Sequence, residues 1–154
     1  MKNKRNAASL LSAAVILLMP FATRAQFEYA EAGYNTFAIL GYTGPGGNVT
    51  IPSSYKGFPV SIIGPSAFNQ QESITSVVIP DSVTTIQGSA FGICTNLTNV
   101  TMGSGVTSIG ESAFASCYGL TNVVIGPNVT SIGDYTYYAC TNLRSLTIPS
   151  SNAV

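Results

Sequence analysis

The chain has 154 residues, of which 45% are apolar and 8% charged, and this composition fits one well-packed domain and excludes intrinsic disorder. Beyond residue 25 it carries two basic residues, Lys56 and Arg144, against six acidic ones, a net charge of −4. Nucleic acid binding needs clustered Lys and Arg, so no nucleic acid partner is expected, and the absence of histidine excludes Ser–His and Cys–His nucleophiles.

Residues 1–25 have the features of a signal peptide. Three basic residues lie among the first five, and a 15-residue, largely apolar run from Ala7 to Phe21 follows, before a small-x-small sequence that ends at Ala25. An uncleaved membrane anchor is the alternative, but the run is shorter than the roughly 20 residues that span a bilayer. We therefore expect cleavage after Ala25, secretion or display at the cell surface, and no membrane span in the mature chain.

Residues 26–47 are predicted to form a cap. Large apolar and charged side chains alternate over 27–31, a turn follows at 33–35, and 36–40 form a second apolar run, so the pair is typical of a β-hairpin. The Gly- and Pro-rich segment 41–47 is a connector. An atypical terminal unit of this kind usually covers the apolar end of a repeat array.

Residues 48–149 repeat one pattern every 23 residues, which predicts a solenoid of stacked coils. The first coil differs from the others, because residues 53–60 are five longer than the matching piece of later coils and should bulge from one edge. The apolar columns are Ile74, Leu97, Leu120, Leu143; Val77, Val100, Val123, Leu146; Ile79, Met102, Ile125, Ile148; and Ile86, Ile109, Ile132.

Each coil is predicted to contain a strand and a return segment. The strand has the pattern Leu-x-x-Val-x-Ile, as in 120–125, and the return piece, as in 106–114, is expected to be a short extended segment followed by one helical turn. Parallel strands should stack about 4.8 Å apart. Residues 150–154 stop part-way round another coil, which suggests end-to-end self-association through an uncapped coil or a piece of a longer array.

Three cysteines, Cys94, Cys117 and Cys140, share one position on successive coils. A spacing of about 4.8 Å exceeds the usual Cβ separation of a disulfide, which is about 3.5 to 4.5 Å. The chain has no histidine and no Cys-x-x-Cys to supply further metal ligands. We expect a buried column of thiols and no metal or cofactor, with one adjacent disulfide or a metal site as the alternatives.

Glu111 and Asp134 are the one pair of carboxylates at equivalent coil positions that could perform acid–base chemistry. Both follow a glycine at a predicted exposed turn, and Gly88 takes their place in the preceding coil. A solvated turn explains them better, so we predict that the protein is not an enzyme.

These motifs resemble a known family. The pattern Leu-x-x-Leu-x-Leu with Pro or Gly after it, Val-Thr-Ser-Ile-Gly at 106–110 and 129–133, Ala-Phe and then Cys is similar to the 23-residue leucine-rich repeats of BspA-like bacterial surface proteins, over about residues 49–149. The resemblance implies a right-handed leucine-rich-repeat solenoid, export, and adhesion or protein binding at the cell surface, with no catalytic residues. Gln71 in place of Cys and Thr136-Tyr137 in place of Ala-Phe depart from the pattern.

The outward strand positions are the candidate binding face, and an extracellular protein or a glycan is the expected partner. These positions form a flat, uncharged surface without the Trp, Tyr or Arg that usually concentrate binding energy. The alternative is therefore a structural spacer or truncated repeat array with no ligand of its own. The two columns are Ser76, Asn99, Asn122 and Ser145, and Val78, Thr101, Val124 and Thr147.

Overall fold

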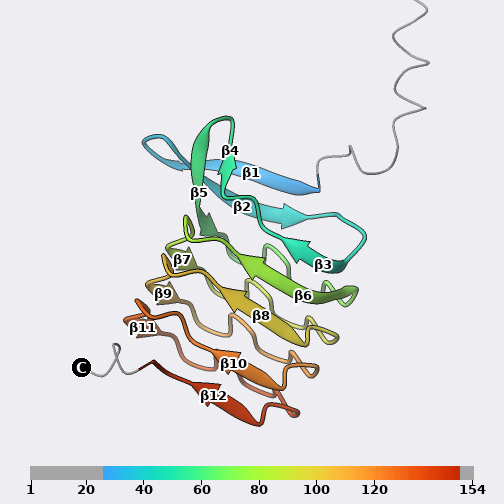
Figure 1. The fold of residues 1–154 in the computed structure, drawn as a ribbon. Coiled ribbons are helices and arrows are strands. Elements are labelled where there is room, and N and C mark those ends of the chain that lie inside the picture. Colours follow the sequence, from blue (N-terminus) through green and yellow to red (C-terminus); the bar gives the residue numbers. More distant parts are fainter. Residues whose placement is uncertain (1–25, 150–154) are drawn as a thin grey trace, which may run out of the picture.

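The computed structural model describes residues 26–149, which form a solenoid of parallel strands. Successive coils stack in chain order from the N-terminal hairpin to β12 (Figure 1). One side of the coils is formed by β3 (Gly47–Thr50), β6 (Ile74–Ile79), β8 (Asn99–Met102), β10 (Asn122–Val124) and β12 (Ser145–Thr147), which we call the front strands. The return side is formed by β5 (Phe58–Ile63), β7 (Thr85–Ile86), β9 (Ser108–Ile109) and β11 (Ser131–Ile132).

The strand registers confirm the period of 23 residues. Val77 pairs with Val100 on the front side, and Ile86 pairs with Ile109 on the return side, both in parallel. The same offset places threonine side chains in a ladder, because Thr107 donates through Oγ1 to the Thr84 carbonyl and Thr130 donates to the Thr107 carbonyl. Each coil is therefore hydrogen bonded to the next through main chain and side chains alike.

The predicted capping hairpin is confirmed. Its strands are β1 (Phe27–Gly33) and β2 (Thr36–Tyr42), which pair antiparallel, and Asn35 takes a positive φ of 58° in the turn. β2 pairs in parallel with β5 and so continues the return sheet above the first coil. The second strand ends at Tyr42, two residues later than expected, because Gly41 and Tyr42 still pair antiparallel with Glu28 and Phe27 of β1.

The predicted bulge in the first coil is a second hairpin. β4 (Ser54–Tyr55) pairs antiparallel with the start of β5. Lys56 and Gly57 join them with φ of 52° and 82°, as a tight two-residue hairpin turn requires. The Tyr55 ring stacks on Tyr29 of the cap with centroids 3.9 Å apart, so the inserted hairpin leans against the capping hairpin.

The expected helical turn in the return segment is wrong, because none of the described residues is helical. In residues 111–116 the chain makes successive tight turns, with positive φ at Ser112 (55°) and Ser116 (58°). Alternate amides bond within the turn, as Ala115 N–H does to the Ser112 carbonyl, and to the next coil, as Phe114 N–H does to the Thr136 carbonyl. In a helix, consecutive amides beyond the first turn bond to carbonyls four residues back. Here every second amide bonds to the next coil instead, and this pattern replaces the expected helical turn.

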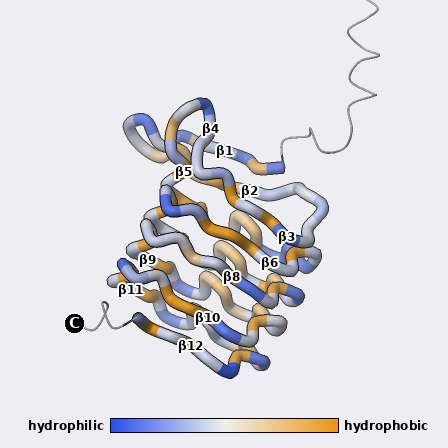
Figure 2. The backbone as a smooth tube through the Cα atoms, in the orientation of Figure 1, coloured by the Kyte–Doolittle hydropathy of each residue, from blue (hydrophilic) through white to orange (hydrophobic). Residues whose placement is uncertain are grey.

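The core lies between the two strand layers as aligned apolar columns, and Figure 2 shows apolar residues recurring in each coil. Phe68, Phe91 and Phe114 are fully buried, and the stack of rings continues to Tyr137. Ring centroids are 4.8 Å apart for Phe68 and Phe91 and 5.1 Å apart for Phe91 and Phe114. Among the described residues, no helix is long and apolar enough to cross a membrane.

Candidate binding face

The front strands place the eight predicted binding residues on one outer surface. Ser76 pairs with Asn99 and Val78 with Thr101 in one ladder, and Asn122 pairs with Ser145 and Val124 with Thr147 in another. Seven of the eight are exposed, and Ser76 is half-buried because its hydroxyl donates to Asn48 Oδ1 at 2.8 Å. The columns predicted from the repeat are thus aligned, and they carry hydroxyl, amide and aliphatic groups without charge.

The front face is interrupted between its third and fourth strands. β8 pairs with β6, and β10 pairs with β12, but no ladder joins β8 to β10 in the described part of the chain. At this position the Gly126 amide lies 3.3 Å from Met102 Sδ and donates to it. Methionine stands in the column that isoleucine occupies in the other coils, and its longer, flexible side chain fits an irregular gap.

A shallow depression of about 360 Å³ opens at this interruption. Three of the predicted residues line it, namely Asn99, Thr101 and Val124. The other five lie outside the depression, on β6, β10 and β12. Sequence reasoning did not assign the rest of the wall to a site: Val100, Met102, Ile125, Gly126, Pro127 and Pro149. The only signal at these positions was methionine in an isoleucine column and proline one residue later than in neighbouring coils. The depression therefore combines apolar walls with uncharged hydrogen-bonding groups, which suits a polypeptide surface.

The cysteines form the predicted column of buried thiols. All three are free, and each Sγ donates to the carbonyl of a phenylalanine on the preceding coil at 3.1 Å: Cys94 to Phe68, Cys117 to Phe91, and Cys140 to Phe114. In the first coil Gln71 replaces cysteine, and its Nε2 donates to the Tyr42 carbonyl of the cap at 3.1 Å. This column therefore contributes hydrogen bonds between coils.

Ionisation is opposed at the thiols of Cys117 and Cys140, whereas the neighbouring Cys117 thiol lowers the pKa of Cys94. Burial, with the neighbouring Cys117 next in importance, raises the pKa of Cys140 to about 11. The adjacent Cys94 sulfur and then burial raise the pKa of Cys117 well above its usual range. Because the thiolate is the reactive form, these two cysteines are poor nucleophiles at neutral pH.

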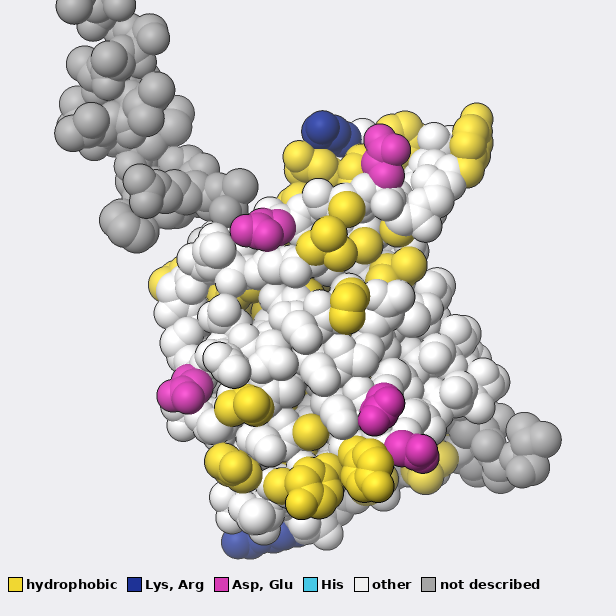
Figure 3. Space-filling model, turned by 180° about the vertical axis from the view of Figure 1, so that it is seen from behind, with side chains coloured by type: hydrophobic (Ala, Val, Ile, Leu, Met, Phe, Trp, Pro, Cys, Tyr) yellow, Lys and Arg dark blue, Asp and Glu magenta, His cyan; other side chains and the backbone are white. Residues whose placement is uncertain are grey.

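The two carboxylates at equivalent coil positions lie in solvent. Glu111 and Asp134 are both exposed on the return side, as predicted. Within residues 26–149, no three His, Cys, Asp or Glu side chains are grouped so as to hold a metal ion. Seen from behind, the surface carries few charged side chains, and apolar ones gather toward its lower edge (Figure 3).

The periodic coils, the parallel front strands and the uncharged outer columns define a leucine-rich-repeat protein with an open strand face. A family model described as a BspA type leucine rich repeat region matches residues 61–154 in six copies. The chain belongs to this family, and the resemblance seen in its sequence is confirmed. Among curated proteins, none matches the chain.

Solved structures of bacterial leucine-rich-repeat proteins share the fold. A protein from Bacteroides capillosus is 26% identical, with a TM-score of 0.76 over 83% of this chain and 97% of its own. A leucine rich repeat protein from T. pallidum is 28% identical, with a TM-score of 0.65 over 80% of this chain and 70% of its own. A leucine rich cell surface protein from Faecalibacterium prausnitzii is 32% identical, with a TM-score of 0.64 over 84% of this chain and 42% of its own.

Proposed function

We propose that this chain is an exported, non-enzymatic module that binds an extracellular or cell-surface protein through its front strands. The observation that carries the proposal is the depression at Asn99, Thr101 and Val124, which lies in the centre of an aligned, uncharged strand face. The family supports a role in protein interaction, and the similar F. prausnitzii structure is that of a leucine rich cell surface protein. A glycan is the alternative ligand, since hydroxyl and amide side chains also bind sugars.

Export rests on the signal peptide predicted over residues 1–25, which lie outside the described residues. The test begins with the full chain secreted from a bacterial host, whose intact mass should correspond to a mature protein that starts at Gln26. This protein is immobilised and exposed to purified extracellular-matrix proteins and to a glycan array. Saturable binding to a protein is expected, and Thr101→Arg should weaken it at least tenfold, because a long charged side chain would cover the depression.

Ser131→Arg is the matched control, since Ser131 is an exposed hydroxyl residue on the return strand β11 and receives the same new charge. Its binding should equal that of the unmodified protein. Equal losses in both variants would assign the effect to net charge and contradict a front-face site. Binding to glycans alone would select the alternative ligand, and no binding to either class would favour a spacer without a ligand.

We also propose that the last described coil contacts the same coil of a second copy. Its inward-column residues are exposed, with Leu146 at 44% and Ile148 at 56%, whereas Val123 and Ile125 of the preceding coil are 2% and 1% exposed. A twofold arrangement would bring two such apolar ends and two β12 edges together. Light scattering should show a mass that rises with concentration, and Ile148→Lys should abolish the rise. Leu40→Lys, at an exposed cap residue, should not; a constant monomer mass would contradict the proposal.

A further inference from the structure

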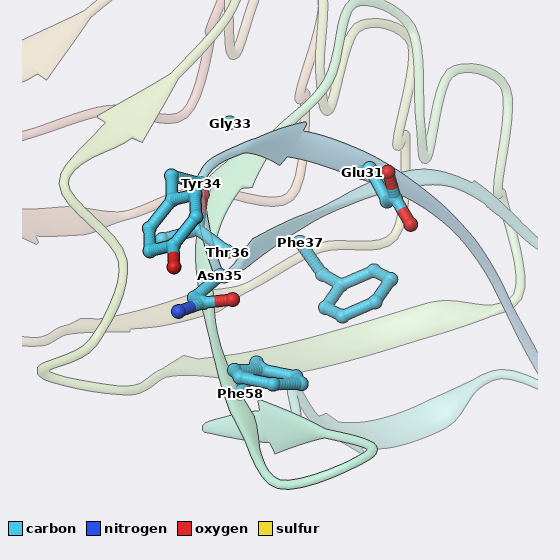
Figure 4. Close-up of a pocket in the computed structure, with 7 residues that line it drawn as sticks. All are labelled: Glu31, Gly33, Tyr34, Asn35, Thr36, Phe37 and Phe58. Carbon is cyan, nitrogen blue, oxygen red and sulfur yellow. The ribbon is translucent and has the colours of Figure 1, made fainter.

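A second concave site lies in the cap, away from the front strands. It has a volume of about 210 Å³ and is formed where the tip of the β1–β2 hairpin meets the inserted β4–β5 hairpin (Figure 4). The side chains that line it are those of Glu31, Tyr34, Asn35, Thr36, Phe37 and Phe58. This volume is below that of most small-molecule pockets and matches roughly one side chain.

The walls of this cap pocket are held in place by a cluster of aromatic rings. Phe37 lies 6.4 Å from Phe58 between ring centroids and meets Tyr55 edge-on at 5.1 Å. Tyr55 in turn stacks on Tyr29, so the floor of the pocket has support from both hairpins. Glu31 is the cross-strand partner of Phe37, which places the carboxylate beside that ring on the same face of the hairpin.

The capping role does not account for these side chains. A terminal unit keeps a repeat array soluble by presenting a polar outer face. Here Tyr34 is 94% exposed at the hairpin tip and Phe58 is 39% exposed at the mouth of the pocket. Exposed rings grouped around a concavity are typical of a binding site, because aromatic side chains supply large contact areas at small entropic cost.

The chemistry of the pocket favours a cation. Its walls combine three aromatic rings with one carboxylate, that of Glu31, and none of its lining residues is basic. Aromatic faces attract ammonium and guanidinium groups through their quadrupole. The same cluster already interacts with one cation of the chain itself, since Lys56 Nζ lies 5.3 Å from the Tyr55 ring centroid. The net charge of −4 after residue 25 also attracts a basic partner.

We propose that the cap pocket receives a lysine or arginine side chain of a partner protein, with its alkyl stem against Phe37 and Phe58 and its charged end near Glu31. This inference rests on the proposed function, because it supplies the aromatic anchor that the front strands lack. It assigns to the partner an exposed basic residue that reaches the cap. The front face would then provide most of the contact area with the partner, and the cap pocket would provide the preference for a basic side chain.

The test is an NMR titration of the ¹⁵N-labelled chain with N-acetyl-lysine methylamide and N-acetyl-arginine methylamide. At least one of them should shift the backbone amides of Gly33, Tyr34, Phe37 and Phe58 in a saturable way. N-acetyl-norleucine methylamide, which has the lysine stem without the charge, should shift them at least fivefold less. Raising the salt concentration should weaken the response, because Glu31 is exposed and its attraction is screened.

Two variants and a control complete the experiment. Phe58→Ala and Glu31→Gln should each weaken binding of the lysine probe at least threefold, while the remaining amide shifts stay at their positions and show an intact fold. Glu111→Gln makes the same change of charge on the return side and should leave binding unaltered. Methyl glucoside is titrated as well, as a sugar probe. The proposal would be overturned by equal shifts with the norleucine compound, by shifts with methyl glucoside alone, or by no shifts with any probe. A failure here leaves the Thr101→Arg result unaffected, so the two sites are judged separately.

Discussion

Phe114→Ala is expected to lower the free energy of unfolding by about 3 to 5 kcal/mol, the range for emptying a buried aromatic position. Phe114 is fully buried and lies between two other rings, with centroids 5.1 Å from Phe91 and 5.6 Å from Tyr137 and interplanar angles of 2° and 6°. Its removal therefore weakens the contacts of one coil with both neighbours. Urea unfolding followed by circular dichroism measures the effect as a shift in midpoint.

The matched control for this prediction is Val124→Ala. Val124 is an apolar residue of the same region, but 58% of its side chain is exposed, so truncation should change stability by no more than about 0.5 kcal/mol. Equal midpoints for Phe114→Ala and the unmodified chain would show that the ring column is not interior, and the solenoid described above would be wrong.

Gly110→Ala is expected to cost about 1 to 3 kcal/mol, the usual range for overpacking a filled interior. A Cβ atom at Gly110 would lie 2.7 Å from the amide nitrogen of Gly88 and 2.8 Å from the carbonyl carbon of Gln87. Both atoms belong to the backbone of the preceding coil, which cannot move aside as a flexible side chain can. The two coils would have to separate, and this would strain the 2.7 Å hydrogen bond from Gly110 N–H to the Ile86 carbonyl.

Gly88→Ala makes the same chemical change where there is room. The nearest atom to a Cβ at Gly88 is 3.4 Å away, and the equivalent positions of the next coils already carry side chains, those of Glu111 and Asp134. The free energy of unfolding of Gly88→Ala should stay unchanged or rise by up to about 1 kcal/mol, because alanine reduces the conformational freedom of the unfolded chain. Thermal unfolding of the two variants side by side is the measurement. A loss for Gly88→Ala as large as that for Gly110→Ala would contradict the close approach of the coils.

The candidate site shows which of its features can be predicted from the sequence repeat and which cannot. Asn99, Thr101 and Val124 could be placed on the front face from their register alone, because residues 23 apart occupy equivalent positions on stacked strands. The depression itself could not, since it depends on the missing ladder between β8 and β10. The cap pocket was likewise hidden, because Glu31, Phe37 and Phe58 lie outside the period and meet only when two hairpins fold together.

The amino-acid sequence by itself determined the apolar columns, the parallel stacking of the coils, the capping hairpin and the column of buried thiols, although Ile132, Leu146 and Ile148 at the end of their columns are exposed. Each of these follows from the alternation and spacing of side chains, which decide locally what must be removed from water. Only the tertiary structure decided that the return segment is a run of turns, since residues such as Ser112 adopt a positive φ when their amides bond the neighbouring coil. Hydrogen bonds between coils form only after the chain has stacked, and no local propensity encodes them.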